Sequence, residues 1–135
     1  MNTVLLDTNI VSYIFKRDSR AALYAPHLLN RELAIAIMTV AELLQWAAVR
    51  KWGVARVQQL EAEFDTYTLL PVDIGVCRQW AHVRAQRSGL GLPISPQDAW
   101  VAATALRYNL PLITHNLDDF QQVSGLTVIT EHTPS

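Results

Sequence analysis

Short runs of apolar, β-prone residues alternate along the chain with longer stretches of helical periodicity. The apolar runs predict strands at 3–6, 33–38, 66–70, 110–114 and 126–130. Between them, apolar residues recur every three to four positions, which predicts helices at 9–16, 20–29, 39–51, 54–64, 73–87 and 97–108. No two strands are joined by a hairpin signal. The pattern therefore predicts an α/β fold with a mainly parallel sheet of about five strands flanked by helices.

Acidic residues stand just after strands or at helix starts, where a parallel sheet places its ligand site. Asp7 follows the first strand, Glu42 lies three residues after Thr39, and Asp98 lies three residues after Ser95. Each acid taken singly is explained as a helix-start residue, Asp7 as a cap and the other two through capping boxes. Capping does not require the three positions to converge on one sheet edge, however. Their shared placement therefore indicates a functional site.

The segment after the fourth strand brings further oxygen atoms to the same edge. It reads Ile-Thr-His-Asn-Leu-Asp-Asp-Phe over 113–120, so Asn116, Asp118 and Asp119 are candidate ligands. Several carboxylates without a matching run of Lys or Arg are what a hard divalent cation needs, and Mg²⁺ or Mn²⁺ is expected. His115 is the histidine nearest to the acids, but a lone histidine is more often structural than catalytic.

Four motifs in order carry a resemblance to a known family. They are Leu-Leu-Asp-Thr-Asn at 5–9, Thr-Val-Ala-Glu-Leu at 39–43, Asp-Ala-Trp-Val-Ala-Ala at 98–103 and Leu-Ile-Thr-His-Asn at 112–116. With these motifs the chain resembles a PIN domain of the VapC kind from about Val4 to Leu126. The resemblance implies one PIN-like nuclease domain over 1–130, followed by a short tail at 131–135.

The resemblance also implies an activity and a set of site residues. The expected protein is a Mg²⁺- or Mn²⁺-dependent ribonuclease that leaves 5′-phosphate and 3′-hydroxyl ends. Asp7, Glu42 and Asp98 match the family's catalytic, metal-binding acids, and Asn116 or Asp119 matches a more variable fourth position. Many relatives carry aspartate where Asn116 stands, and an amide brings no charge to a metal.

Polar neighbours of the acids are expected to support them. Thr8, Asn9 and Thr114 would orient metal-bound waters or hold the acids, although turn and cap roles explain these residues about as well. Basic residues on the helix at 73–87 are candidates for RNA contact, and Lys and Arg near the end of the first helix are further ones. A solvated helix face explains each of them singly. The candidates are Arg78, Arg84 and Arg87, with Lys16, Arg17 and Arg20.

Composition limits where and how such a protein works. The 135 residues suit one domain, and the net charge of -1 excludes RNA binding through an overall basic excess, so local patches must bind it. The single cysteine, Cys77, excludes an intramolecular disulfide and is expected to be buried. No signal peptide and no apolar run long enough for a membrane are visible, so a cytoplasmic protein without membrane association is expected.

Partners follow from the resemblance. VapC-like proteins are commonly homodimers and are held by a small VapB-like antitoxin, so both are expected here beside the RNA substrate. A groove near Ile14, Phe15 and Trp46 is a candidate for the antitoxin's helix. Two other interpretations stay open: a non-catalytic RNA-binding or scaffold protein, and another Mg²⁺-dependent phosphohydrolase. The second usually has Asp-x-Asp after the first strand, where this chain has Asp-Thr-Asn at 7–9.

Overall fold

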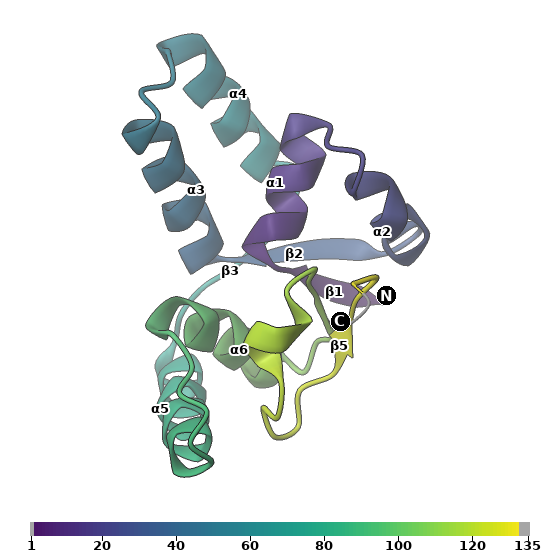
Figure 1. Ribbon diagram of the computed structural model, residues 1–135. Helices are drawn as coiled ribbons and strands as arrows, with labels where there is room; N and C mark the ends of the chain where they lie inside the picture. The colour runs from purple at the N-terminus through teal and green to yellow at the C-terminus, as the bar shows by residue number, and fades with distance from the viewer. Residues whose placement is uncertain (1, 133–135) are drawn as a thin grey trace.

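Five parallel strands form one sheet, and helices cover both of its faces (Figure 1). The computed structural model describes residues 2–132. The strands run in the order β3-β2-β1-β4-β5, and every neighbouring pair is parallel. They are β1 (Thr3–Leu6), β2 (Glu32–Ala36), β3 (Thr68–Leu70), β4 (Leu112–Ile113) and β5 (Val128–Ile129). The predicted α/β fold with a parallel sheet is confirmed.

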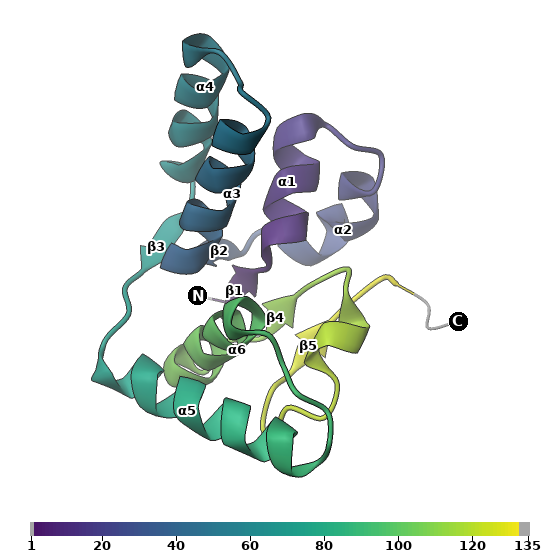
Figure 2. The same ribbon diagram turned by 60° about the vertical axis from the view of Figure 1, so that its left-hand side comes forward.

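The helices divide into two groups on opposite faces of the sheet. Figure 2 shows the first four on one side and the last two on the other. The first group is α1 (Thr8–Lys16), α2 (Ala21–Leu28), α3 (Ile37–Val49) and α4 (Val54–Phe64). The second is α5 (Ile74–Gly89) and α6 (Pro96–Tyr108), and a 3-10 turn, η1 (Leu117–Phe120), follows β4. None of these helices, in the part of the chain described, is long and apolar enough to cross a membrane.

Alternate side chains of the central strand β1 serve the two halves of the core. Val4 and Leu6 pack with the α1–α4 group, whereas Leu5 packs with the α5–α6 group. All three are at most 1% exposed, because a parallel strand in the middle of a sheet is covered on both faces. This is why the strand is an uninterrupted apolar run in the sequence.

The strand register fixes which residues meet at the carboxyl edge of the sheet. Leu6 pairs with Ile35 on one side and with Ile113 on the other. The backbone N–H of Asp7 then donates to the Ile113 carbonyl at 2.9 Å. The residues that follow β1, β2 and β4 therefore lie side by side, as expected for a parallel sheet.

The start of α3 differs from the prediction. The helix begins at Ile37, and its N-cap is Ala36, which makes no side-chain capping bond. The capping box predicted from Thr39 to Glu42 is therefore wrong, and Thr39 is fully buried inside the helix. The apolar run at 33–38 contains both the end of β2 and the first turn of α3, and apolar content alone does not show where one passes into the other.

Helix α5 also corrects two expectations. It continues to Gly89, two residues beyond the predicted end at residue 87, and a left-handed backbone conformation follows at Gly91 with φ 72°. Its buried positions are Val76, Val83 and Arg87, which share one face of the helix. Cys77 lies beside that face and is exposed, so the prediction of a buried cysteine is wrong.

The end of the chain is held against α2 as far as the structure describes it. The Glu131 backbone N–H donates to the Tyr24 hydroxyl at 3.1 Å, and the His27 ring lies 3.3 Å from the Glu131 carboxylate. His132 packs edge-on to His115 at 5.2 Å between ring centroids. Residues 133–135 of the predicted tail lie outside the described residues.

Candidate functional site

Asp7 lies between β1 and α1 and uses its two carboxylate oxygens differently. Oδ1 accepts the backbone N–H of Thr8 at 2.8 Å, so the residue caps α1. Oδ2 accepts the Thr114 hydroxyl at 2.7 Å and the Asn9 side-chain amide at 3.4 Å. The residue as a whole is 5% exposed. Asp7 is therefore a helix cap whose second oxygen is fixed by residues from the edge of the sheet.

Glu42 comes to the same edge from the second turn of α3. Its Oε1 lies 3.3 Å from the Thr8 hydroxyl, which donates to it. The Thr8 hydroxyl also lies 3.0 Å from that of Thr39, the buried residue one turn before Glu42. A chain of hydroxyls thus connects the start of α1 to the helix that carries Glu42. Because α3 has no side-chain cap, Glu42 has no capping role here.

Asp98 lies in the first turn of α6. The Ser95 hydroxyl accepts the backbone N–H of Asp98 at 3.1 Å, and Pro96 is the first residue of the helix. The predicted serine cap is confirmed. It engages the backbone of Asp98, so the cap does not depend on the aspartate side chain.

Burial raises the pKa of all three acids, and the negative charge of neighbouring acids adds to this. Burial raises the pKa of Asp7 to about 7, against hydrogen bonds from Thr114 and Thr8, and the charges of Asp98 and Glu42 raise it further. Burial and the charge of Asp98 raise the pKa of Glu42. Residues 35 or more positions apart in the sequence therefore interact electrostatically at one sheet edge.

A fourth acid faces this group from η1. Burial raises the pKa of Asp98 first of all, and the Asp119 charge adds to this, while Ser95 and Arg87 oppose it. Asp118 turns to the Gln121 side chain instead, at 3.0 Å. Across residues 2–132, no three His, Cys or acidic side chains are close enough to form a ready-made metal cage. The site is a set of converging carboxylates.

Thr114 connects the polar residues around Asp7. Its buried hydroxyl donates to Asp7, accepts the Asn116 backbone N–H at 3.0 Å and lies 3.4 Å from the Asn9 amide. The Asn9 side-chain oxygen accepts the His115 backbone N–H at 3.3 Å. Asn116 itself is exposed. The β4–η1 segment is therefore held to the start of α1 by hydrogen bonds.

The sequence did not indicate the role of two residues that support the site, Thr39 and Tyr24. Thr39 was interpreted as a cap, and its contact with Thr8 depends on how α1 meets α3. The hydroxyl of the buried Tyr24 lies 2.5 Å from His115 Nδ1 and steadies the segment that follows Thr114. The apolar periodicity of α2 is weak, so the sequence does not indicate that Tyr24 makes this contact.

The basic residues of α5 have different surroundings. Arg87 is 6% exposed, and its guanidinium donates to the carbonyls of Leu92 at 2.6 Å and Asp119 at 3.2 Å. Its predicted place on an exposed RNA-contact face is therefore wrong, because it falls on the buried face of α5. Arg78 is exposed, and Arg84 is half-exposed over the Trp80 ring.

The metal-free protein is expected to be more stable at pH 5.5 than at pH 8. The folded pKa of Asp7 is about 7 against 3.8 in the unfolded chain, so the folded state binds the extra proton. The stability gained is complete below about pH 4 and is lost as the pH rises through 7. Thermal unfolding in EDTA measures this, and Asp7→Asn should show a smaller difference between the two pH values. A variant with the same pH dependence as the parent would contradict the assignment.

Adding Mn²⁺ should reverse that trend, because metal binds the deprotonated carboxylates. At about 100 times its dissociation constant, Mn²⁺ should stabilise the fold by roughly 2.7 kcal/mol at pH 8. A melting temperature indifferent to Mn²⁺, with no heat of binding by calorimetry, would count against a metal site.

The chain is similar over most of its length to one family of known proteins. Residues 4–126 match the sequence model of the PIN domain family. Ribonuclease VapC1 of Haemophilus influenzae strain R2866 is 30% identical over 127 residues, which cover 90% of this chain and 92% of that protein. All four acids of the site lie within the matched residues.

Solved structures show the same fold. VapBC-1 from nontypeable Haemophilus influenzae superposes with a TM-score of 0.82 at 29% identity, over 95% of this chain and 97% of that one. VapBC2 from Rickettsia felis, solved with a DNA fragment from its promoter, has a TM-score of 0.84 at 22% identity, over 95% and 98%. At that identity the second likeness concerns the fold alone.

Proposed function

The chain belongs to the PIN domain family, and on that premise we propose that it is a divalent-metal-dependent ribonuclease, the toxin of a toxin–antitoxin pair. The observation that carries the proposal is the group of Asp7, Glu42 and Asp98, whose charges interact at the carboxyl edge of the sheet. The relatives named VapC ribonucleases support RNA as the substrate. Metal-dependent RNA cleavage by the purified chain, compared with a variant that lacks one acid, tests the proposal.

The donor set fits Mg²⁺ or Mn²⁺. Carboxylate oxygens are the ligands that these hard cations prefer, and the charge of Asp98 raises the pKa of both Asp7 and Glu42. Asp7, Glu42 and Asp98 would hold the ion, with Asp119 as the fourth acid in preference to Asp118. When bound, the cation activates water and offsets negative charge on the phosphate.

The chain's own polar residues keep the acids in position. Thr114 and the Thr8 N–H fix both oxygens of Asp7, so its carboxylate cannot rotate without losing a hydrogen bond. The Thr8 hydroxyl bonds to Glu42 and so couples the two acids. Residues that hold a metal-binding carboxylate in one orientation support metal binding. We assign that role to Thr8, Asn9 and Thr114.

An antitoxin is the proposed partner. The solved structure of VapBC-1 from nontypeable Haemophilus influenzae supports a VapB-like protein as the regulator of this chain. Its means of inhibition follows from the charge of the site: an Arg or Lys placed among Asp7, Glu42 and Asp98 would form charge-assisted hydrogen bonds and exclude the metal. The cytoplasm, where RNA and such a partner meet, is the proposed compartment.

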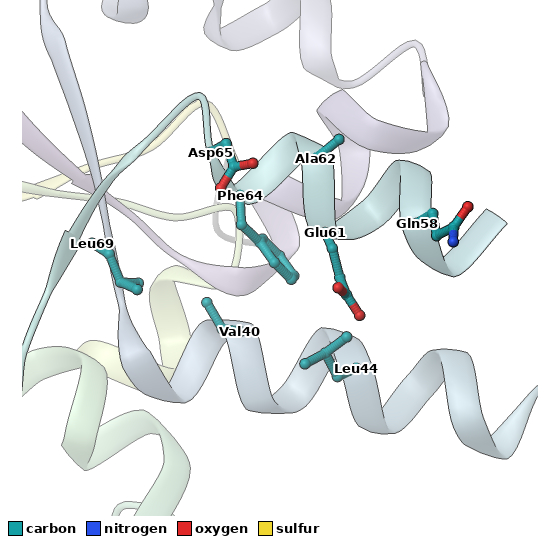
Figure 3. Close-up of a pocket in the computed structure, with 8 residues that line it drawn as sticks. All are labelled: Val40, Leu44, Gln58, Glu61, Ala62, Phe64, Asp65 and Leu69. Atoms are coloured by element: carbon teal, nitrogen blue, oxygen red, sulfur yellow. The ribbon is translucent and has the colours of Figure 1, made fainter. Parts of the chain in front are cut away.

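Self-association is proposed at the β3 edge of the sheet. A pocket of about 580 Å³ lies between α3 and α4, and Figure 3 shows Phe64 directed from α4 toward Val40 and Leu44 on α3. Leu69 lines the pocket from β3 and is 45% exposed. Three more exposed apolar residues lie near Leu69. Val72 and Ile74 follow β3 in the chain, and Ile37 follows the end of β2, which pairs with β3. A surface of this kind on an edge strand suits a second copy of the chain.

Replacing Leu69 and Ile74 by arginine is expected to convert a dimer into a monomer. Two charges in an apolar interface should weaken self-association at least about tenfold. Sedimentation equilibrium measures the change. The matched control is Val49→Arg, an exposed apolar position at the end of α3 away from this edge. An unchanged dimer, or a parent chain that is monomeric throughout, would refute the proposed interface.

A further inference from the structure

Cations stacked on aromatic rings gather where α1 and α3 end and α4 begins. The Lys16 ammonium and the Arg50 guanidinium lie 5.9 Å and 5.5 Å from the centre of the Trp46 ring. The Arg56 guanidinium lies 4.3 Å from the Trp52 ring, and Phe15 stacks on that ring at 5.9 Å. We name this set the basic-aromatic cluster: Phe15, Lys16, Trp46, Arg50, Trp52 and Arg56.

The positive charges of this cluster act on one another, and the charge of Asp18 opposes them at Lys16. Burial lowers the pKa of Lys16, and the charges of Arg50 and Arg56 lower it further. In the chain from 2 to 132, none of these three side chains forms an ion pair. A protein with a net charge of -1 thus concentrates positive charge here. Such a local patch attracts a polyanion.

A polar cleft of about 500 Å³ opens beside the cluster. It is lined by residues from the end of α1 and from α4: Ile14, Phe15, Lys16, Arg17, Arg56, Gln59 and Glu63. Its one acid, Glu63, accepts the Tyr67 hydroxyl at 2.5 Å. The remaining charged groups of the cleft are cations, so it suits an anionic ligand.

The same helices carry the acidic site at their other ends. Asp7 caps the start of α1 and Lys16 is its last residue, which at 1.5 Å per residue places the two residues roughly 13.5 Å apart along the axis. Glu42 lies near the start of α3, and Arg50 caps its end. Figure 2 shows α1, α3 and α4 side by side, rising from the sheet in the same layer. A ligand would have to extend along this helix layer to reach from the acids to the cluster.

Resting on the proposed ribonuclease function, we propose that the basic-aromatic cluster is a second RNA contact, separate from the acids. Its guanidinium groups bind phosphates through their N–H groups. One face of the Arg56 guanidinium lies on the Trp52 ring, and the opposite face would receive an unpaired base. The substrate is therefore an RNA with a single-stranded segment long enough to reach both the acids and the cluster.

The test measures RNA binding apart from cleavage. Lys16→Gln, Arg50→Gln and Arg56→Gln, combined in an Asp98→Asn background, are titrated with fluorescent bulk transfer RNA in EDTA. The dissociation constant should rise at least about tenfold, and the salt dependence should become shallower by about 0.7 in log–log slope for each lost phosphate contact. The control is Arg31→Gln, since Arg31 lines a pocket at the amino edge of the sheet. That variant should bind like the Asp98→Asn parent.

A second readout uses the active protein. With Asp98 intact, the cluster variants should lower kcat/KM for transfer RNA more than for a tetranucleotide, so the ratio of the two falls, while Arg31→Gln keeps the parental ratio. Variants that bind transfer RNA as tightly as the parent overturn the second contact alone. Loss of antitoxin binding with RNA binding retained also overturns it, and assigns the cluster to a protein partner. A parent that neither binds nor cleaves RNA overturns the ribonuclease proposal as well.

Discussion

Replacing Asp98 by asparagine is expected to reduce metal-dependent RNA cleavage about a hundredfold or more while the protein stays folded. The change removes one ligand charge and leaves the side-chain volume almost the same. The helix start should survive, because the Ser95 cap bonds to the backbone of residue 98 and not to its side chain. Asp7→Asn should lose activity in the same way.

The measurement is cleavage of labelled RNA in Mg²⁺ or Mn²⁺, with 5′-phosphate ends mapped on the products and folding checked by thermal unfolding. Asp118→Asn is the matched control, because that nearby acid bonds to Gln121 and its charge does not contribute to the raised pKa of Asp98. Undiminished cutting by well-purified Asp98→Asn would falsify the metal-site assignment.

Glu42→Gln extends this result to an acid for which the sequence offered a second explanation. Since Ala36 caps α3, loss of activity in this variant cannot be attributed to a lost capping box. The hydrogen bond from Thr8 can persist to the amide oxygen, so the melting temperature should change little. A large loss of stability without loss of activity would show that Glu42 has a structural role only.

Expression of the chain alone is expected to stop bacterial growth, and co-expression with the small protein encoded beside it should restore growth. The reason is that a nuclease without its inhibitor would cut the host's own RNA. Colony counts after induction measure the effect, and co-purification shows the complex. Asp98→Asn is the control, since it should be harmless on its own.

If the chain does not slow growth and no neighbour-encoded protein binds it, the toxin role fails. The nuclease proposal would survive that result, because cleavage by the purified protein is measured independently.

The layer structure and the sheet edge that carries the candidate site were predictable from the sequence alone. The alternation of apolar runs with helical periodicity predicts the parallel sheet, since buried strands and amphipathic helices differ in period. Asp7 follows the apolar run Val4–Leu6 directly, which is enough to place it at a carboxyl end. The cap at Ser95 was also predictable, because it depends on contacts between residues three positions apart.

Element boundaries and burial were decided by the tertiary structure. The end of β2 is set by its pairing with β1 and β3, so the run at 33–38 could not show that a helix begins at Ile37. Arg87 falls on the face of α5 that packs inward, where two backbone carbonyls stabilise its charge. Because arginine side chains are usually exposed, the sequence does not indicate that Arg87 is buried.

The chemistry of the site also depended on the fold. The carboxylate of Asp7 is ordinary in the sequence, and only its burial beside two other acids raises its pKa to about 7. The basic-aromatic cluster joins side chains from α1, α3, α4 and the turn between α3 and α4, which are separated by up to 41 positions from Phe15 to Arg56. The local sequence pattern predicts helices and strands because these depend largely on interactions between residues close together in the chain. Charge interactions between distant residues exist only once the helices have packed.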